Sequence, residues 1–170
     1  MQVAIGTSSF AFVDSAPLEI LQSKGIEVVQ NPFLRKFTED EIIYHLQDVD
    51  GLLAGLDPLN INVFKKCSKL KAIPRVGTGM DNVDIDAAKL TGIKVSRTLE
   101  APTDAVSEMT LSAALALSRS ILTTNKALHN KQWRKSISIG LKNTNVLIIG
   151  YGRIGRRVSE LFRVFNAHIM

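Results

Sequence analysis

The 170-residue sequence has little cysteine and few aromatic residues: Cys67 is the only cysteine, and aromatics make up 6% of the chain. A lone cysteine cannot form a disulfide within the chain, and this usage predicts a reducing, cytoplasmic compartment. The aromatic residues do not alternate with basic ones in the stripe that single-stranded nucleic acid requires, so we expect no nucleic-acid partner. The net charge of +5 is spread along the chain and favours a small anionic ligand.

Long apolar runs are also missing. No apolar stretch reaches the length that spans a membrane, and the first ten residues lack the basic and apolar regions of a signal peptide, so we expect no membrane partner. The three histidines, His45, His129 and His168, have no second ligand or carboxylate at suggestive spacing. We therefore predict no metal site and give them surface or structural roles, with His45 on the polar side of its helix.

Up to about residue 96, short apolar runs alternate with amphipathic segments, which is typical of a parallel α/β sheet. Strands are expected at residues 3–5, 26–29, 51–55, 70–73 and 93–95, and helices at residues 16–25, 38–46, 61–70 and 84–92. Thr38 and Glu41 have the spacing of a capping box, and Gly25 and Gly92 follow helices as C-caps do. These signals predict a small α/β domain over residues 1–96.

Residues 97–170 have a different character. Thr103 and Asp104 precede an expected helix at residues 105–121, which is apolar or small on most of its circumference and must be covered on several sides. A second helix should end near Trp133, and we expect the Trp133 side chain to be a packing anchor. The chain closes with a strand, a glycine turn, a helix and the first residues of another strand. We interpret this part as linker and interface helices followed by the first, incomplete β–α unit of a second domain.

The motif GYGRIG, Gly150 to Gly155, stands between an expected buried strand, NVLII, and a helix. Gly150 would permit a tight turn, Gly152 would let the backbone approach a pyrophosphate, and Gly155 would allow the helix to pack closely on the strand. The phosphates would lie at the helix N-terminus, where free N–H groups favour negative charge. A glycine-rich turn that binds nothing is the alternative, and the flanking elements favour dinucleotide binding.

A second glycine loop, PRVGTGMDNVD at residues 74–84, follows an expected strand at the end where parallel sheets bind ligands. Gly77 and Gly79 would expose backbone N–H groups that can hold a carboxylate. The loop is equally compatible with a tight turn whose Asp and Asn side chains only cap the next helix. The residues alone leave both interpretations open.

Four segments taken in order resemble the D-isomer-specific 2-hydroxyacid dehydrogenases, most closely their phosphoglycerate-dehydrogenase-like branch. They are AGLDPLN, LKAIPRVGTGMDNVDIDAAKLTGIKVS, APTDAVSEMTLSAALALSRSI and NVLIIGYGRIGRRV. The resemblance implies a flavodoxin-like parallel-sheet substrate domain followed by the start of a Rossmann NAD-binding domain, which that family inserts within the substrate domain. A typical member is roughly twice as long, so we expect this chain to be an N-terminal part.

The resemblance also implies roles for individual residues. Thr78 and Gly79 match the loop whose backbone amides hold the substrate carboxylate, and Thr78 is also expected close to the nicotinamide. Arg153 and Ile154 match residues whose backbone N–H groups meet the cofactor pyrophosphate, with Gly150, Gly152 and Gly155 shaping the turn. The helix from Asp104 through Ile121 resembles one that joins the domains and packs in the dimer, which implies a homodimer for the full-length form.

The activity that the resemblance implies is hydride exchange between NAD and a small anionic 2-hydroxy or 2-oxo acid. The catalytic Arg, Glu and His of the family lie beyond Met170, so no catalytic residue is assigned here, and the 170 residues alone are expected to be inactive. NADP is not excluded, because the residue that selects NAD falls at or just past Met170. A non-catalytic NAD-sensing or dimerisation module is the competing hypothesis.

Two departures from the family pattern affect the expected site. The segment SRTLE, Ser96 to Glu100, replaces an Asn-Thr-Pro-like sequence in the cofactor loop. Some phosphoglycerate dehydrogenases have a cation near the position of Gly55 or Leu56, and its absence weakens the case for a phosphate-ester substrate.

Overall fold

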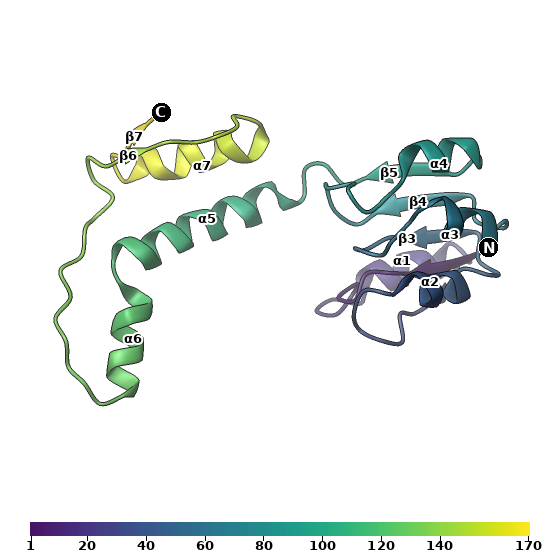
Figure 1. Ribbon diagram of the computed structural model, residues 1–170, viewed down its shortest axis with the longest axis horizontal. Coiled ribbons are helices and arrows are strands. Elements are labelled where there is room, and N and C mark those ends of the chain that lie inside the picture. Colours follow the sequence, from purple (N-terminus) through teal and green to yellow (C-terminus); the bar gives the residue numbers. More distant parts are fainter. The chain divides into compact units, whose positions relative to one another are not determined.

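The computed structural model describes residues 1–170, which form two compact units, Met1–Leu99 and Glu100–Met170 (Figure 1). Each unit has its own hydrophobic core. Neither contains a helix with the length and apolarity needed to cross a lipid bilayer.

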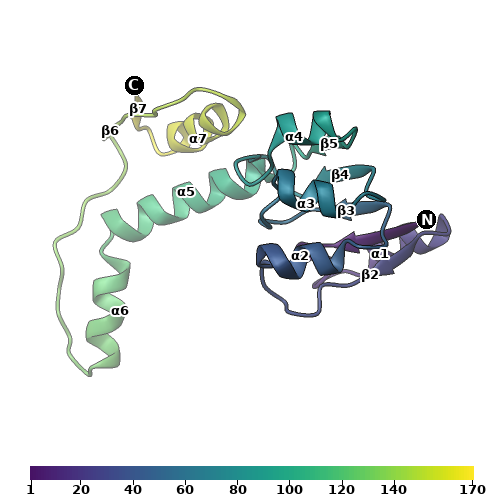
Figure 2. The same cartoon turned by 45° about the vertical axis from the view of Figure 1, so that its right-hand side comes forward.

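The first unit is built on a five-stranded parallel sheet (Figure 2). Its strands are β1 (Gln2–Ile5), β2 (Glu27–Val29), β3 (Gly51–Leu53), β4 (Ala72–Arg75) and β5 (Lys94–Arg97). The spatial order is β2-β1-β3-β4-β5, and all neighbours pair in parallel. This order is that of flavodoxin-like folds, so the predicted fold class is confirmed, and the order of strands reverses between β1 and β3.

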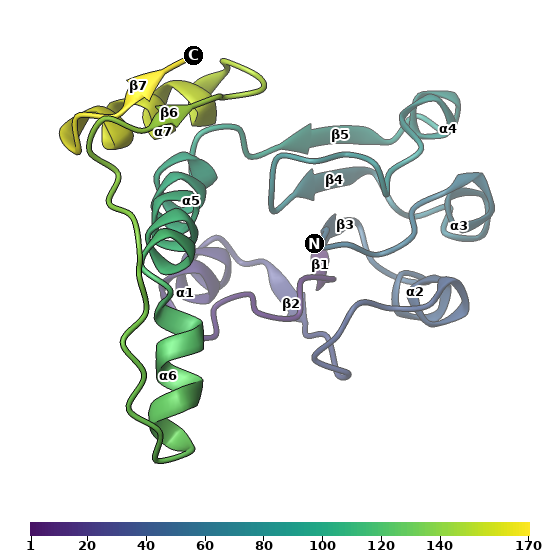
Figure 3. The ribbon, with the colours of Figure 1, turned by 60° about the vertical axis from the view of Figure 1, so that its left-hand side comes forward.

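Four helices connect these strands: α1 (Ala16–Ser23), α2 (Glu39–His45), α3 (Ile61–Lys66) and α4 (Ile85–Leu90). Figure 3 shows α1 on one face of the sheet and the other three on the opposite face. The predicted capping box of α2 is present, because Thr38 and Glu41 each accept a backbone N–H of the other. Gly25 and Gly92 have φ of +69° and +74° after their helices, as the sequence predicts.

The core of the first unit lies between the sheet and helices α2, α3 and α4. Its largest fully buried apolar side chains include Ile42, Leu52, Phe64 and Ile73. Burying each stabilises the fold by about 1.5–3 kcal/mol. Cys67 is also buried, with its sulfur 3.7 Å from the carbonyl oxygen of Ile43, and burial raises the pKa of the thiol.

His45 lies on the inner side of α2, which corrects the expectation that it faces solvent. Its ring stacks on Phe37 with the centroids 4.6 Å apart, and Nε2 lies 3.3 Å from the carbonyl oxygen of Ile5. This partial burial lowers the pKa of the imidazole. The helical periodicity could not show this, because Phe37 precedes the helix and its ring is brought under α2 by tertiary contacts.

The second unit contains α5 (Pro102–Ser118), α6 (Ile121–His129), β6 (Asn145–Val146), α7 (Arg153–Val164) and β7 (His168–Ile169). Strands β6 and β7 pair in parallel around α7, so the predicted strand–turn–helix–strand unit is present. Helix α5 packs along α7, and Asp104 accepts a hydrogen bond of 2.9 Å from Nε of Arg157. Helix α5 starts at Pro102, which places Thr103 and Asp104 inside its first turn rather than before it.

Two expectations for the second unit are wrong. The segment NVLII is not a buried strand, because regular pairing ends at Val146, and Leu147 and Ile149 are 67% and 94% exposed. Only β7 pairs with β6 in this chain, and α7 covers only one face of the pair. Trp133 is 86% exposed and anchors no packing, since it lies in the irregular segment after α6.

Candidate functional site

The carboxyl ends of β1, β3 and β4 lie at one edge of the sheet, next to the reversal of strand order between β1 and β3. Open α/β sheets bind ligands at this kind of switch point. A cavity of about 440 Å³ opens there, which we call the switch-point cavity. It is lined by residues that follow the three strands, by the last residue of β4 and by one lysine from the β2–α2 connection: Gly6, Thr7, Ser8, Ser9, Lys36, Gly55, Leu56, Arg75, Val76 and Gly77.

Two residues of the cavity lining each have a buried side-chain polar atom without a hydrogen-bond partner in the chain, the hydroxyl oxygen of Thr7 and Nε of Arg75. Arg75 is 8% exposed, and its Nη1 donates only to the carbonyl oxygen of the next residue, Val76. Neither Arg75 nor Lys36 forms an ion pair, since all five ion pairs of the chain involve other residues. The switch-point cavity therefore contains two cations and no carboxylate in its lining.

Asp57 holds the loops around the cavity in place. Its buried carboxylate accepts the backbone N–H of Phe37 over 2.9 Å and that of Gly55 over 3.3 Å. Burial raises the pKa of Asp57, and these two hydrogen bonds oppose the rise. A Cβ atom on Gly6 would collide with the Asp57 carboxylate, so a larger residue at this position would displace that buried group.

The loop after β4 fastens the loop after β3. The Asn82 side-chain amide donates to the carbonyl oxygens of Asp57 over 2.8 Å and Gly55 over 3.2 Å. Asp84 caps α4 by accepting the N–H of Ala87 over 2.9 Å. The capping interpretation of this loop is thus correct for Asp84, whereas Asn82 supports the neighbouring loop instead.

Thr78 and Gly79, the predicted carboxylate-binding residues, come directly after the cavity lining and are not part of it. Their backbone N–H groups donate to no group in the chain. The Thr78 hydroxyl donates to the carbonyl oxygen of Thr98 over 2.9 Å, which fixes the loop to the segment after β5. Gly77 has a φ of +145°, a conformation that favours glycine. The two N–H groups are therefore free to donate to a ligand, and the predicted carboxylate-binding role stays a prediction.

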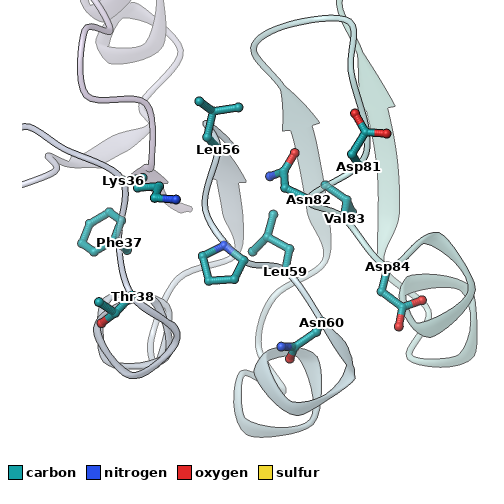
Figure 4. A pocket seen from close by; sticks show the side chains of 11 residues that line it. Lys36, Phe37, Thr38, Leu56, Leu59, Asn60, Asp81, Asn82, Val83 and Asp84 are labelled. Carbon is teal, nitrogen blue, oxygen red and sulfur yellow. The ribbon is translucent and has the colours of Figure 1, made fainter.

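A second pocket of about 610 Å³ lies on the other side of the Leu56 loop, toward α2, α3 and α4 (Figure 4). Lys36, which also lines the switch-point cavity, points into this second pocket from the β2–α2 connection, and Asp81 and Asp84 line the far side of the pocket. The Asn60 and Asp84 side chains are already used as helix caps. With one lysine and two aspartates, this pocket does not have the cationic lining of the switch-point cavity.

The GYGRIG turn of the second unit has a glycine with positive φ and leads into a helix without a side-chain cap. Gly150 has a φ of +96°, and a Cβ atom on Gly155 would collide with the carbonyl oxygen of Gly150. A Cβ atom on Gly152 would meet no atom within 4 Å, so this side of the turn is open to a ligand. Helix α7 begins at Arg153, followed by Ile154, without a side-chain cap, which leaves its first N–H groups available.

Sequence reasoning missed Thr7, Lys36 and Arg75. Thr7 follows β1 closely and Arg75 ends β4, so the rule that ligands bind at the carboxyl edge would have found both. Lys36 gives no such signal, because its place depends on the hydrogen bond from Phe37 to Asp57. No three His, Cys, Asp or Glu side chains come together in an arrangement that could hold a metal ion.

Comparison with known proteins gives consistent matches. The family model described as D-isomer specific 2-hydroxyacid dehydrogenase, catalytic domain, matches residues 9–152. D-3-phosphoglycerate dehydrogenase of Sus scrofa is 35% identical over 157 residues, which cover 91% of this chain and 29% of that protein. The enzyme of the same name from Methanocaldococcus jannaschii is 32% identical over 136 residues, covering 78% of this chain and 26% of that one. The chain thus spans less than a third of these relatives.

Solved structures match over nearly the whole chain. The NAD+-bound 3-phosphoglycerate dehydrogenase of Entamoeba histolytica has a TM-score of 0.81 and 26% identity, covering 99% of this chain and 52% of that one. The TT0316 protein of Thermus thermophilus has a TM-score of 0.87 at 24% identity, covering 99% of this chain and 55% of that one. The second match is a likeness of fold.

Proposed function

Because this chain belongs to the D-isomer-specific 2-hydroxyacid dehydrogenase family and is similar to its phosphoglycerate-dehydrogenase-like members, we propose that it is part of an NAD-dependent oxidoreductase acting on the CH–OH group of a small 2-hydroxy acid. The observation that carries the proposal is the GYGRIG turn. A Cβ atom on Gly152 would meet no neighbouring atom, and helix α7 begins after it without a side-chain cap. Residues 1–96 would serve as the substrate domain, and residues 97–170 as interface helices and the start of the NAD-binding domain.

The substrate carboxylate would be held by the backbone N–H groups of Thr78 and Gly79. Both N–H groups lack partners within the chain, and oriented backbone amides can bind an anion without a side-chain charge. The hydrogen bond from Thr78 to Thr98 would keep this loop in one conformation before substrate arrives.

The cofactor pyrophosphate would bind at the N-terminus of α7, on the backbone N–H groups of Arg153 and Ile154. Gly152 leaves room for it, because no atom lies where its side chain would be. NAD would supply the nicotinamide ring that accepts hydride from the substrate C2 carbon. A bound NAD+ in the E. histolytica relative supports this choice, and NADP is compatible with the same turn.

The proton acceptor would come from sequence outside this chain, together with an Arg and a Glu. Within the chain, the ring nitrogens of His45 and His129 lie beside the carbonyl oxygens of Ile5 and Asn125, His168 is exposed on β7, and none of the three histidines lines the switch-point cavity. The 170 residues alone would therefore bind ligands without turnover. The full-length enzyme would be a cytoplasmic homodimer that packs through α5 and α6. Met109, Leu117 and Leu122, which are exposed on these helices, support such an interface.

Fluorescence titration of the purified chain with NADH tests the cofactor site. Gly152→Ala should weaken NADH binding by about tenfold or more, because the new methyl group would occupy the space of the pyrophosphate. Gly140→Ala is a matched control, since Gly140 also has no atom near its Cβ position but lies away from the turn. Equal affinity in the two variants would contradict the proposed cofactor site.

Turnover separates the enzyme from a non-catalytic NAD-sensing or dimerisation module. NADH should form from NAD and a panel of 2-hydroxy acids with the protein encoded by the whole gene, and not with the 170-residue chain. Tight NADH binding by the whole protein without any turnover would favour the sensing module instead.

A further inference from the structure

A third pocket of the first unit, with a volume of about 350 Å³, opens between α2 and the segment that precedes it. Four of its lining side chains carry rings, those of Phe33, Phe37, Tyr44 and His45, and Pro32 completes its apolar wall. We call it the aromatic pocket. It shares no lining residue with the switch-point cavity, so what binds there does not depend on the proposed function.

The rings of the aromatic pocket hold one another in place. The buried ring of Phe37 meets Phe33 edge to face with the centroids 5.6 Å apart, and it stacks on His45 at 4.6 Å. Phe33 and Tyr44, in contrast, are 46% and 78% exposed. Exposed aromatic side chains around a hollow are typical of a binding site. The pocket therefore offers ring surface that the chain itself does not cover.

The charges of the lining are negative. Asp40 and Glu41 both line the pocket, and no lysine or arginine does. Glu41 is paired with the Arg35 guanidinium over 2.7 Å, whereas Asp40 forms no ion pair. Burial lowers the pKa of His45, so its ring adds no positive charge at neutral pH. The Asp40 carboxylate is therefore the uncompensated charge of this lining.

The aromatic faces favour the same sign of ligand charge as Asp40 does. The face of an aromatic ring is negative and attracts a cation placed over it. Arg35 already uses this attraction, because its guanidinium carbon lies 4.8 Å from the centre of the Phe33 ring. Asp40 and Tyr44 stand one helical turn apart on the same side of α2, so one cation can contact both the carboxylate and the Tyr44 ring.

We propose that the aromatic pocket binds a small primary amine with an aromatic body, as a site separate from those of the substrate and the cofactor. The ammonium group pairs with Asp40 beside the Tyr44 ring, and the body packs on Phe33 and Phe37. The volume sets the size of the ligand, because about 350 Å³ is near the lower end of the range for ligand pockets, about 300–1,000 Å³. One ring fits this space, and a nucleotide is too large for it.

Isothermal titration calorimetry of the purified chain with phenethylamine tests the charge of the ligand. Phenethyl alcohol has the same body without the charge, and phenylpropionate has the opposite charge. The amine should bind saturably, the alcohol about fivefold or more weakly, and the anion more weakly still. Equal affinities of the amine and the alcohol would overturn the proposal.

Two pairs of variants test the residues. Asp40→Asn should weaken phenethylamine binding by roughly threefold to fivefold, as expected for one exposed charged contact. Asp48→Asn is the matched control, because Asp48 is also exposed but lies outside the pocket. Tyr44→Leu should weaken binding by about twofold to fivefold, and Tyr44→Phe, which keeps the ring face, should not. Equal affinities within either pair would contradict the site.

NMR titration of the isotope-labelled chain locates the amine. Phenethylamine should shift the backbone N–H signals of Phe33, Tyr44 and His45 and leave that of Gly77, in the switch-point cavity, in place. Shifts at Gly77 without shifts at Tyr44 would overturn the proposal. These measurements contain no cofactor and no turnover. A failure of NADH binding would therefore count against the proposed function and leave the amine site standing.

A lysine side chain of a protein partner has the same ammonium chemistry as a small amine. N-acetyl-lysine methylamide reproduces that side chain and its backbone without an aromatic body. It should bind more weakly than phenethylamine, because it cannot stack on Phe33 and Phe37. Tighter binding of the lysine derivative would assign the pocket to a peptide segment and overturn the small-ligand proposal.

Discussion

Asp57 accepts a hydrogen bond of 2.9 Å from the backbone N–H of Phe37, twenty residues earlier in the chain. The bond joins the loop after β3 to the segment that precedes α2. Because Lys36 is next to Phe37, this one carboxylate also sets where a cation of the switch-point cavity stands. Asp57 therefore fixes the β2–α2 connection to the loop after β3 at the edge of the switch-point cavity.

Asp57→Asn should destabilise the first unit by about 1–3 kcal/mol, since the Asn amide oxygen can accept only one of the two buried N–H groups and its NH2 group would face the other. Urea denaturation followed by circular dichroism measures this change. Asp48→Asn is the matched control, because the Asp48 side chain is exposed and makes no hydrogen bond. An unchanged midpoint for Asp57→Asn would show that the bonds to Phe37 and Gly55 contribute nothing.

Glu41 makes the stability of the first unit depend on pH. Its pKa is lowered from an ordinary value of 4.5 to about 2, chiefly by the hydrogen bonds from the Arg35 guanidinium, which lies 2.7 Å away. A lowered pKa means that the stabilising contribution is complete above pH 4.5 and is lost as the pH falls toward 2. The melting temperature of the wild-type chain should therefore fall more between pH 5 and pH 2.5 than that of Glu41→Gln.

Glu108→Gln provides the reference for this pH series, because Glu108 is exposed on α5 and makes no ion pair. Its melting curve should keep the full pH dependence of the wild type. Identical slopes for Glu41→Gln and the wild type would show that the pair with Arg35 does not hold in solution.

Gly155→Ala should destabilise the second unit by about 1–3 kcal/mol, because the added Cβ would collide with the carbonyl oxygen of Gly150, a backbone atom that cannot move aside. Gly152→Ala should leave thermal stability close to that of the wild type, since its Cβ position is open. Differential scanning calorimetry of both variants tests the contrast. Equal stabilities would mean that the turn is looser than the structure indicates.

Amide hydrogen exchange should alternate along the chain after β6. The N–H of Ile148 donates to the carbonyl oxygen of Met170 over 2.9 Å, whereas those of Leu147 and Ile149 have no partner. We expect Leu147 and Ile149 to exchange rapidly and Ile148 more slowly in the 170-residue chain. Strong protection of all three would require a further strand on that edge, from a second copy of the chain.

The fold of the first unit could be predicted because its signals are local. Apolar runs, the capping box of Thr38 and the glycines after α1 and α4 fix strands and helices without reference to distant residues. The conformation of the GYGRIG turn could be predicted for the same reason, since Gly150 and Gly155 act on the backbone next to them.

The errors concern residues whose surroundings come from elsewhere in the chain. His45 reads as a polar helix position, and only the ring of Phe37 and the end of β1 bring it inside. Ile149 is apolar enough for a core, but the chain supplies no partner on its open side. Lys36 was missed for the same reason. No local pattern indicates that the β2–α2 connection contributes to the lining of the switch-point cavity.

The buried Cys67 has a practical consequence for measuring ligand binding in the switch-point cavity. As the only thiol of the chain, shielded by the core and with a raised pKa, it will react very slowly with maleimide reagents. A cysteine introduced at Ser9, an exposed residue of the cavity lining, would then be the sole reactive position. A single fluorophore could be attached there without first removing the native cysteine, and the chain would become an optical reporter of ligand binding in this cavity.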